Sequence, residues 1–317
     1  MRRLRLGLIG DRIGPSRSPA LHRICGDLAG IAVAYDLLMP PVLGRSFEDV
    51  LAEALITRDG FNVTLPYKER VLSHLSLPDR AVARIGAVNT VCTHLGMGGL
   101  AEGHNTDHTG FIAAWRAAFG AGPAGRVALF GAGGVGKAIG FALLRLGAAE
   151  IGIIDPDAAK AGALAAALNA AAAEAGQPPP ARVAPPEALG SADGVVNATP
   201  LGMAGHPGSP LPEEVAFPRD AWAFDAVYTP AETPFRASAM AAGAGFLPGW
   251  ELFFHQGLDA FRLFTGVAID TPAEVRRRLL AADQHPGLSR PPRAMPGEGV
   301  RFAAFHGVPR ASIFLLK

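Results

Sequence analysis

The sequence predicts a mixed α/β protein with two domains, one of them built around a doubly wound parallel sheet. Three observations predict this fold class. At 317 residues the chain is long for a single hydrophobic core. Short apolar runs alternate with helical patterns along most of its length, as they do in consecutive βαβ units. A glycine-rich turn at residues 131–136 separates one apolar run from one helical pattern, which is typical of a nucleotide-binding sheet.

Composition and charge limit the classes of protein to which the chain can belong. Hydrophobic residues make up 49% and charged residues 18%, which indicates a folded, globular chain. The net charge of +1 gives no electrostatic reason to expect a nucleic acid or an anionic membrane as partner. No apolar run is long enough to span a membrane. We therefore expect a cytoplasmic protein, a monomer or a homodimer, whose partner is a small molecule.

The N-terminus and the two cysteines each allow a second interpretation. The basic start and the apolar run 6–9 resemble the beginning of a signal peptide, but charge at 11–12 interrupts the run, so a buried first strand is favoured. Cys25 and Cys92 stand far apart without a paired motif. We therefore expect two buried thiols, and neither a disulfide framework nor a metal site.

The first hundred residues alternate between strand and helix patterns. Strands are expected at 4–10, 33–40, 60–66 and 87–96, and helices at 18–30 and 47–56. The last of these strands is expected to form a hairpin with residues 99–107.

A second unit begins with an expected helix at 108–119. Further elements are expected as a strand–turn–helix at 125–147, a strand at 150–157, an alanine-rich helix at 158–175, and strands at 193–200 and 221–230. The proline-rich residues 177–189 are expected to form a surface connection. The pattern from about 126 to 246 predicts a parallel, doubly wound sheet.

The C-terminal part of the chain is expected to return to the first unit. Helices are expected at 251–266 and 271–282, the second with Thr271 as cap and Pro272 at its first position. Residues 1–107 and 250–284 are therefore assigned to a first domain and residues 108–249 to a nucleotide-binding domain. Residues 285–317, rich in proline, glycine and arginine, are expected to be a poorly ordered tail.

The glycine-rich turn predicts a Rossmann site for a dinucleotide. Gly131, Gly133 and Gly136 have G-x-G-x-x-G spacing after an apolar strand and before a helix. The first glycine permits a tight turn, the second lets backbone amides approach a pyrophosphate, and the third allows the helix to pack closely on the strand. The expected contact residues are the whole turn: Gly131, Ala132, Gly133, Gly134, Val135 and Gly136.

An acidic residue should follow at the end of the next strand to bind the adenosine ribose. Asp155 lies 19 positions after Gly136 and fits this role. As an alternative it caps the alanine-rich helix, with Pro156 in the first turn, although Asp157 could cap that helix equally well. A carboxylate repels a 2′-phosphate, and Lys160 is the nearest basic residue. The site therefore favours NAD over NADP.

Several polar residues of the first domain stand where strands or turns end. They are Ser16, Ser18, Asn62, Thr64, Lys68, Asn89 and Asp107. Each has an ordinary alternative when taken alone: Ser18 precedes Pro19 and could cap a helix, and Lys68 could be a solvated lysine at a helix start.

Together with the glycine turn, these residues resemble the shikimate dehydrogenase family, and particularly its NAD-using quinate/shikimate branch. The similarity runs in family order from Leu6 to about Leu280 and is carried by SRSPALH, FNVTLPYK, GAVNT, HNTD, FGAGGVGKA, VNATPLGM, AVYTP and HQGLDAFRLFTG.

The resemblance implies a role for each of these residues. Ser16 and Ser18 would hold the substrate carboxylate, with Tyr228 nearby, while Thr64, Asn89 and Gln256 would bind ring hydroxyls. Lys68 and Asp107 would form the catalytic pair, in which Lys68 exchanges a proton with the reacting hydroxyl and Asp107 orients both groups. Thr199 and Gly249 would border the nicotinamide half of the cofactor. The implied reaction interconverts shikimate, quinate or both with the 3-dehydro ketone, and use of NAD favours oxidation over biosynthetic reduction.

The sequence departs from the family at three places. Asp155-Pro156-Asp157 replaces the Asn-Arg-Thr type stretch of NADP-using members, which is a further reason to expect NAD. Glu251 and Leu252 replace a small residue and methionine near the nicotinamide. Ser18 stands where members that favour quinate often have threonine, so both acids are expected as substrates.

Other functions use the same fold. A dehydrogenase for an aminated shikimate would share these motifs, and a quinate sensor would share the fold without turnover. A non-catalytic Rossmann protein is a third alternative. The presence of Lys68, Asp107 and the complete glycine turn favours an enzyme over both non-catalytic proteins.

Overall fold

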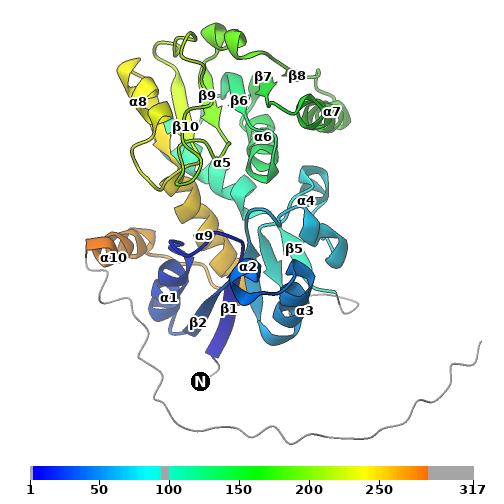
Figure 1. Cartoon of the computed structure of the whole chain (residues 1–317), viewed down its shortest axis with the longest axis vertical. Helices are drawn as coiled ribbons and strands as arrows, with labels where there is room; N and C mark the ends of the chain where they lie inside the picture. Colours follow the sequence, from blue (N-terminus) through cyan, green and yellow to red (C-terminus); the bar gives the residue numbers. More distant parts are fainter. Residues whose placement is uncertain (1–2, 94–99, 285–317) are drawn as a thin grey trace, which may run out of the picture.

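The computed structural model describes residues 3–93 and 100–284, and it contains two sheets joined by long helices (Figure 1). The first sheet has five strands in the order β2-β1-β3-β4-β5. Its strands are β1 (Arg3–Ile9), β2 (Ala32–Leu38), β3 (Gly60–Val63), β4 (Thr90–Cys92) and β5 (Glu102–His104). Strand β1 is parallel to both of its neighbours, whereas β4 is antiparallel to β3 and β5. The predicted hairpin of β4 and β5 is therefore confirmed.

The second sheet has six strands, all parallel, in the order β11-β10-β9-β6-β7-β8. They are β6 (Gly125–Phe130), β7 (Ala148–Ile154), β8 (Ala181–Val183), β9 (Gly194–Asn197), β10 (Trp222–Asp225) and β11 (Gly245–Pro248). The order reverses between β6 and β9, which confirms a doubly wound sheet. In such sheets a ligand binds beyond the carboxyl ends of the strands at the point of reversal.

Helices cover both sheets and connect them. They are α1 (Ser18–Ala29), α2 (Pro40–Leu43), α3 (Phe47–Thr57), η1 (Arg70–His74), α4 (Arg80–Ile85), α5 (Thr106–Phe119), α6 (Gly134–Arg145), α7 (Ala158–Glu174), η2 (Pro186–Ser191), α8 (Pro234–Ala241), α9 (Gly249–Thr265) and α10 (Pro272–Gln284). Pro272 is the first residue of α10, and the Thr271 carbonyl accepts the amides of Glu274 and Val275.

Residues 177–189 lie mostly at the surface, as predicted, but the segment also contains secondary structure that was not predicted. This segment contains the edge strand β8 and the short helix η2. The Ile151 amide donates to the Pro180 carbonyl, and Ala181 pairs beside Ile151 in the sheet. The prolines lie on either side of β8 and not within it, so they do not remove a ladder hydrogen bond.

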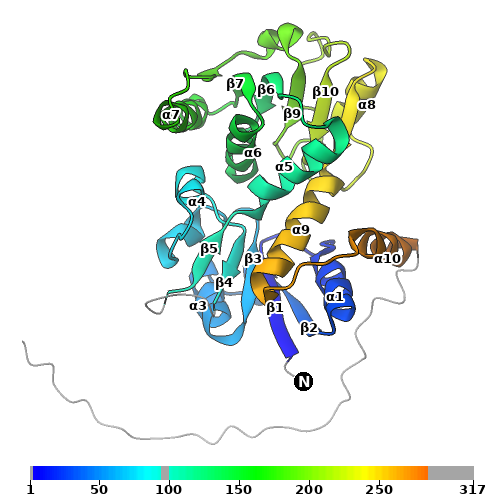
Figure 2. The same cartoon turned by 180° about the vertical axis from the view of Figure 1, so that it is seen from behind.

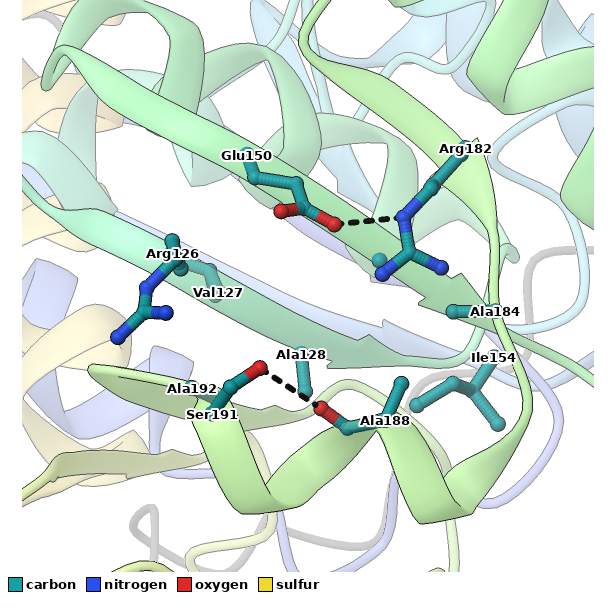
Figure 3. Close-up of a pocket in the computed structure, with 11 residues that line it drawn as sticks. Arg126, Val127, Ala128, Glu150, Ile154, Arg182, Ala184, Ala188, Ser191 and Ala192 are labelled. Atoms are coloured by element: carbon teal, nitrogen blue, oxygen red, sulfur yellow. Dashed lines mark hydrogen bonds and ion pairs between the residues drawn. The ribbon is translucent and has the colours of Figure 1, made fainter.

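One face of the six-stranded sheet, at β6, β7 and β8, carries a shallow pocket next to η2 (Figure 3). Its rim is charged, and the Arg182 guanidinium pairs with Glu150 there. None of the predicted site residues lines this pocket.

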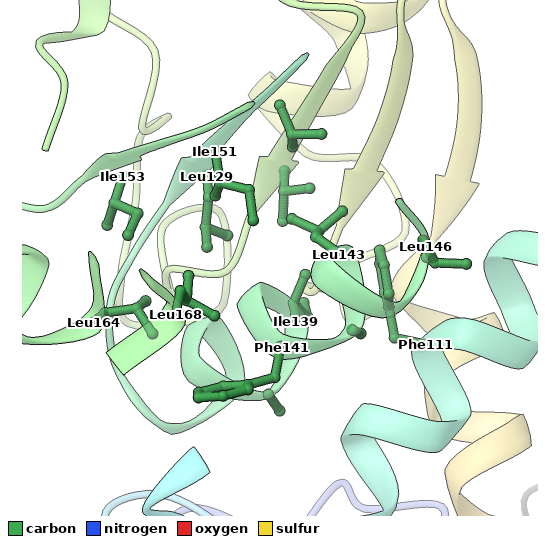
Figure 4. Close-up of a cluster of buried hydrophobic side chains, with 14 of the residues drawn as sticks. Phe111, Leu129, Ile139, Phe141, Leu143, Leu146, Ile151, Ile153, Leu164 and Leu168 are labelled. Carbon is green, nitrogen blue, oxygen red and sulfur yellow. The ribbon is translucent and has the colours of Figure 1, made fainter. Parts of the chain in front are cut away.

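The other face of the six-stranded sheet is buried under α5, α6 and α7 (Figure 4). Strand residues such as Ile151 and Ile153 pack against Ile139 of α6 and against Leu164 and Leu168 of α7. Most other residues of α7 are alanines, so the predicted alanine-rich helix buries a narrow stripe of leucine and alanine.

Helices α5 and α9 cross between the two sheets, as Figure 2 shows. A Cβ atom added at Gly110 of α5 would lie 2.7 Å from the Gln256 amide nitrogen and 2.9 Å from its Cα, so only glycine allows this close crossing. Beyond the crossing, α9 and α10 pack against α1 through a cluster that includes Leu21, Phe261 and Leu279. The C-terminal helices therefore lie beside the five-stranded sheet.

Both cysteines are buried and unpaired, as expected. In the part of the chain that the structure describes, no helix is long and apolar enough to cross a membrane. The same residues contain no cluster of histidine, cysteine and acidic side chains that could hold a metal ion.

One fully buried histidine makes the stability of the fold depend on pH. His22 of α1 stacks on Tyr35, with ring centroids 4.9 Å apart. Burial lowers the pKa of His22 to about 3, although a hydrogen bond with Asn62 opposes this shift. The unfolded histidine titrates near pH 6.5. Between these two values the unfolded chain binds the extra proton, so stability is lost as the pH falls.

We predict that His22→Phe, which keeps an aromatic ring in place, weakens this dependence. Below about pH 6 the wild-type free energy of unfolding should fall by about 1.4 kcal/mol for each pH unit of acidification because of His22, and the variant should lack this decrease. Urea unfolding at about pH 7, 6 and 5 measures both slopes. Parallel slopes for the two proteins would contradict the assignment, since contributions from the other histidines cancel in the comparison.

Candidate active site

The glycine turn lies between β6 and α6 and has the geometry that its sequence predicts. Gly131 has a positive φ of 98°, which favours glycine. A Cβ at Gly136 would lie 1.9 Å from the Gly131 carbonyl oxygen, so the helix can approach the turn only without a side chain. At Gly133 a Cβ would meet no atom within 4 Å. The turn is thus closed on its inner side and open on the side that a ligand would approach.

Asp155 holds this turn in place. One carboxylate oxygen accepts the Ala132 amide at 2.8 Å and the other accepts the Asp157 amide at 2.9 Å. Asp157 is the residue that caps α7, because its side chain accepts the amides of Ala159 and Lys160. The alternative role of Asp155 as the cap of α7 is therefore wrong. Asp155 remains at the carboxyl edge of the sheet, where a carboxylate can accept further hydrogen bonds.

Thr199 and Gly249 both lie at the carboxyl edge of the six-stranded sheet. The Thr199 methyl group would lie 3.1 Å from a Cβ at Gly131, so Thr199 borders the glycine turn. Its hydroxyl donates to Asn197 Oδ1 at 2.7 Å. A Cβ at Gly249 would lie 2.5 Å from the Asp225 carbonyl oxygen, so glycine is required where α9 begins.

The sequence analysis did not identify Asp225, whose hydrogen bonds hold the loops at the carboxyl edge of the six-stranded sheet. Asp225 is buried and accepts hydrogen bonds from Asn197 Nδ2 at 2.9 Å, the Thr233 hydroxyl at 2.6 Å and the Val227 amide at 3.0 Å. Burial raises the pKa of Asp225, and these three hydrogen bonds oppose the shift. The signal was present in the sequence, since Asn197 and Asp225 each end an apolar strand.

Lys68 and Asp107 form a buried ion pair between the two sheets. The Lys68 ammonium donates to Asp107 Oδ2 at 2.6 Å, and the two residues are only 7% and 6% exposed. Asp107 lies in the first turn of α5. A Cβ at Gly134 of α6 would lie 3.4 Å from the Lys68 side chain, so the pair is adjacent to the glycine turn. The alternative of a solvated Lys68 is wrong.

This ion pair has no evident structural purpose. Burying two charges costs several kcal/mol per ion, and a buried pair adds little net stability compared with apolar side chains. A lysine and a carboxylate that meet beside a nucleotide turn are instead candidates for acid–base chemistry.

Asn89 and Gln256 come together beside Thr106. Asn89 Oδ1 accepts the Thr106 amide at 2.7 Å, and Asn89 Nδ2 donates to the Thr106 hydroxyl at 3.0 Å and to Gln256 Oε1 at 3.5 Å. Thr64 lies at the end of β3 beside Gly10, where a Cβ would meet its methyl group at 2.5 Å. Sequence reasoning missed Thr106, although it directly precedes Asp107.

Ser16 and Ser18 lie together at the start of α1. The Ser16 hydroxyl donates to the Ser18 hydroxyl at 3.2 Å and accepts the Ser18 amide at 3.2 Å. Ser18 is the first residue of the helix, and its hydroxyl makes no capping bond. The alternative role of Ser18 as an N-cap is therefore wrong.

Tyr228 comes from the loop after β10 and stacks on Phe253, with centroids 5.4 Å apart. Burial raises the pKa of Tyr228, and the nearby charge of Arg17 opposes this shift. Tyr228 therefore lies near the side chain of Arg17, the residue between Ser16 and Ser18 in the chain.

The departures at Glu251 and Leu252 have a structural explanation. Glu251 forms a bidentate pair with Arg276 of α10, at 2.6 and 2.8 Å, and so contributes to the attachment of α10. Leu252 is buried in the same hydrophobic cluster as Ala132 of the glycine turn. Leu252 thus keeps this position apolar and buried.

Comparison with known proteins adds independent information. The family profile described as shikimate dehydrogenase substrate binding domain matches residues 8–91. A quinate/shikimate dehydrogenase (NAD(+)) of Corynebacterium efficiens is 42% identical over 270 residues, which cover 84% of this chain and 94% of the relative. A shikimate dehydrogenase (NADP(+)) of Streptomyces avermitilis is 42% identical over 268 residues, which cover 82% and 90%. The structure of quinate dehydrogenase from Corynebacterium glutamicum in complex with NAD has a TM-score of 0.78 at 35% identity, covering 88% of this chain and all of that chain.

The geometry of the glycine turn predicts two different outcomes for two alanine substitutions. Gly136→Ala should destabilise the protein by about 2 kcal/mol or more, because its methyl group would overlap the Gly131 carbonyl oxygen. Gly133→Ala is the matched control and should change the melting temperature little, because the space beside Gly133 is open. Thermal unfolding followed by circular dichroism measures both. Equal stability of the two variants would contradict the described packing.

Proposed function

Because the chain belongs to the shikimate dehydrogenase family, we propose that it catalyses the NAD-dependent interconversion of shikimate, quinate or both with the corresponding 3-dehydro ketone. The buried pair of Lys68 and Asp107 beside the glycine turn is the observation that carries this proposal. Residues 1–107 and 250–284 would form the substrate-binding domain, and residues 108–249 the NAD-binding domain.

The substrate carboxylate would bind at the start of α1. Ser16 and Ser18 supply two hydroxyl donors that already face each other, and Tyr228 supplies a third from the other sheet. Hydroxyl groups are effective donors to a carboxylate when the site is shielded from water. The three residues would thereby fix one end of the ring.

The ring hydroxyls would bind at the other end of the site. Asn89 and Gln256 have amide groups that can both donate and accept hydrogen bonds, and Thr64 adds a hydroxyl. The Asn89 amide is held by Thr106, so its orientation is set before a substrate arrives. Such preorganisation lowers the cost of orienting a polyol.

Lys68 would exchange a proton with the reacting hydroxyl. Asp107 would orient both the Lys68 amine and that hydroxyl. Oxidation of a secondary alcohol requires the hydroxyl proton to leave when the hydride leaves the carbon. The low exposure of both side chains keeps bulk water from the point of transfer. When bound, NAD supplies the acceptor for the hydride.

The residues around the glycine turn fit a dinucleotide. The open side of Gly133 and the N-terminus of α6 offer backbone amides to a pyrophosphate. Asp155 would accept hydrogen bonds from the adenosine ribose, and Thr199 and Gly249 would border the nicotinamide.

NAD is proposed in preference to NADP on electrostatic grounds. The Asp155 carboxylate would repel a 2′-phosphate, and the nearest base, Lys160, lies 3.7 Å from Asp157 in an ion pair of its own. The names of the two relatives at 42% identity include one NAD and one NADP enzyme, so direct measurement is needed.

Purified protein should reduce NAD in the presence of shikimate or quinate, and should reduce NADP more slowly. Absorbance of the reduced nicotinamide measures all four combinations of acid and cofactor. The ratio of the two rates with NAD identifies the preferred acid. If the folded protein binds NAD and is inactive with both acids, the activity is contradicted, and an aminated substrate or a sensor function becomes the better explanation.

Lys68→Met should lower kcat by about two to four orders of magnitude, because it removes the group that exchanges the proton. The KM for the acid should change much less, since the serines and amides that bind the substrate remain. Steady-state kinetics gives both constants, and titration with NAD confirms that the cofactor still binds. Near-normal turnover in this variant would exclude Lys68 from proton exchange.

A further inference from the structure

Tyr35 lies in the middle of β2, outside the set of residues that would touch a substrate, and is 2% exposed. Its hydroxyl donates to Asn62 Oδ1 at 2.9 Å. Asn62 belongs to β3, and β1 lies between β2 and β3 in the sheet. The phenol therefore reaches across a whole strand to a buried carboxamide.

Asn62 is also hydrogen-bonded to Asn89, which would bind a ring hydroxyl, and to the neighbouring Thr90. Its Nδ2 donates to the Asn89 carbonyl oxygen at 3.2 Å and to the Thr90 hydroxyl at 3.0 Å. The Thr90 hydroxyl in turn donates to Asn89 Oδ1 at 3.1 Å and lies 3.1 Å from the Thr106 hydroxyl. The bonds among these side chains are buried, so water cannot replace a bond that is lost.

The Tyr35 phenol is held in a fixed orientation. Burial raises the pKa of Tyr35, and the neighbouring Ser18 hydroxyl opposes this shift. The ring itself is fixed, because His22 stacks on it with an angle of 13° between the planes. The phenol is thus a rigid donor that is directed at Asn62.

We propose that Tyr35 is a positioning residue that fixes the Asn62 carboxamide and thereby the position of Asn89, at the hydroxyl end of the substrate. The inference rests on the proposed function. Without the phenol hydroxyl, Asn62 Oδ1 would lose this donor, and the carboxamide would be held less firmly, through its Nδ2 bonds to Asn89 and Thr90. A substrate held at both ends tolerates little such movement.

Tyr35→Phe tests this role, because it keeps the stacked ring and removes only the hydroxyl. The kcat/KM for the acid that the wild type oxidises should fall about tenfold, through a higher KM. The KM for NAD should stay within about twofold, because the hydrogen bonds described do not reach the glycine turn. A change of both KM values together would indicate general loosening of the fold and would overturn the proposal.

Tyr67→Phe is the matched control. Tyr67 is also a buried tyrosine of the first sheet's core, and its hydroxyl donates to Asp11 instead of to Asn62. Tyr35→Phe loses a buried phenol hydrogen bond and Tyr67→Phe a partly buried one, so both melting temperatures should fall. Only Tyr35→Phe should change the KM for the acid.

A double-mutant cycle separates positioning from independent effects. If Tyr35 acts through Asn62, Tyr35→Phe combined with Asn62→Ala should be no worse in kcat/KM than Asn62→Ala alone. Additive losses would overturn the proposal. Should Tyr35→Phe fail to fold, Thr90→Val can be tested in its place, because it removes the hydroxyl that accepts from Asn62 Nδ2. This variant should show the same selective rise in the KM for the acid. An unchanged KM for the acid would also overturn the proposal.

Failure of the proposed function can be told apart from failure of this inference. A wild type that is inactive with both acids contradicts the function, and calorimetric titration with shikimate then compares binding to the wild type and to Tyr35→Phe. Binding weakened about tenfold in the variant supports the positioning role even without turnover. Equal binding, or none by the wild type, overturns it.

Discussion

The close crossing of α5 and α9 is the constraint on which the rest of the structure depends. It is possible because Gly110 has no side chain where the backbone of Gln256 passes. Helix α5 begins at Thr106, beside the five-stranded sheet, and ends beside the six-stranded sheet, while α9 runs the opposite way (Figure 2). One crossing therefore brings Asp107 and Gln256 to the same place, between the substrate residues of one sheet and the glycine turn of the other.

Polar groups buried at this crossing must satisfy one another. Lys68 is paired with Asp107, and Asn89 is bonded to Thr106, because neither charge nor amide can be left without a partner away from water. Each of these bonds also fixes an orientation. The same hydrogen bonds thus offset the cost of burying polar groups and fix the orientations that a reaction needs.

Prediction succeeded where the physical requirement is local. The glycine turn, the strands on either side of it and the cap at Asp157 each depend on a few neighbouring residues, and the structure has them at the expected positions. Prediction failed at β8, because three residues between prolines carry no period that marks a strand, and their pairing is supplied by β7. The roles of Ser18 and Asp155 were also ambiguous, since a helix cap and a site residue use the same side chains.

The sequence by itself determined the α/β class, the doubly wound sheet and the chemical types of residue in the site, because apolar periodicity and glycine spacing express backbone requirements directly. It also determined the family, through motifs in a fixed order. Only the tertiary structure decided which of those residues meet. Tyr35, Asn62 and Asn89 lie on different strands, and the bonds that join them depend on sheet order and burial. Contacts between distant segments arise from packing, which no local pattern records.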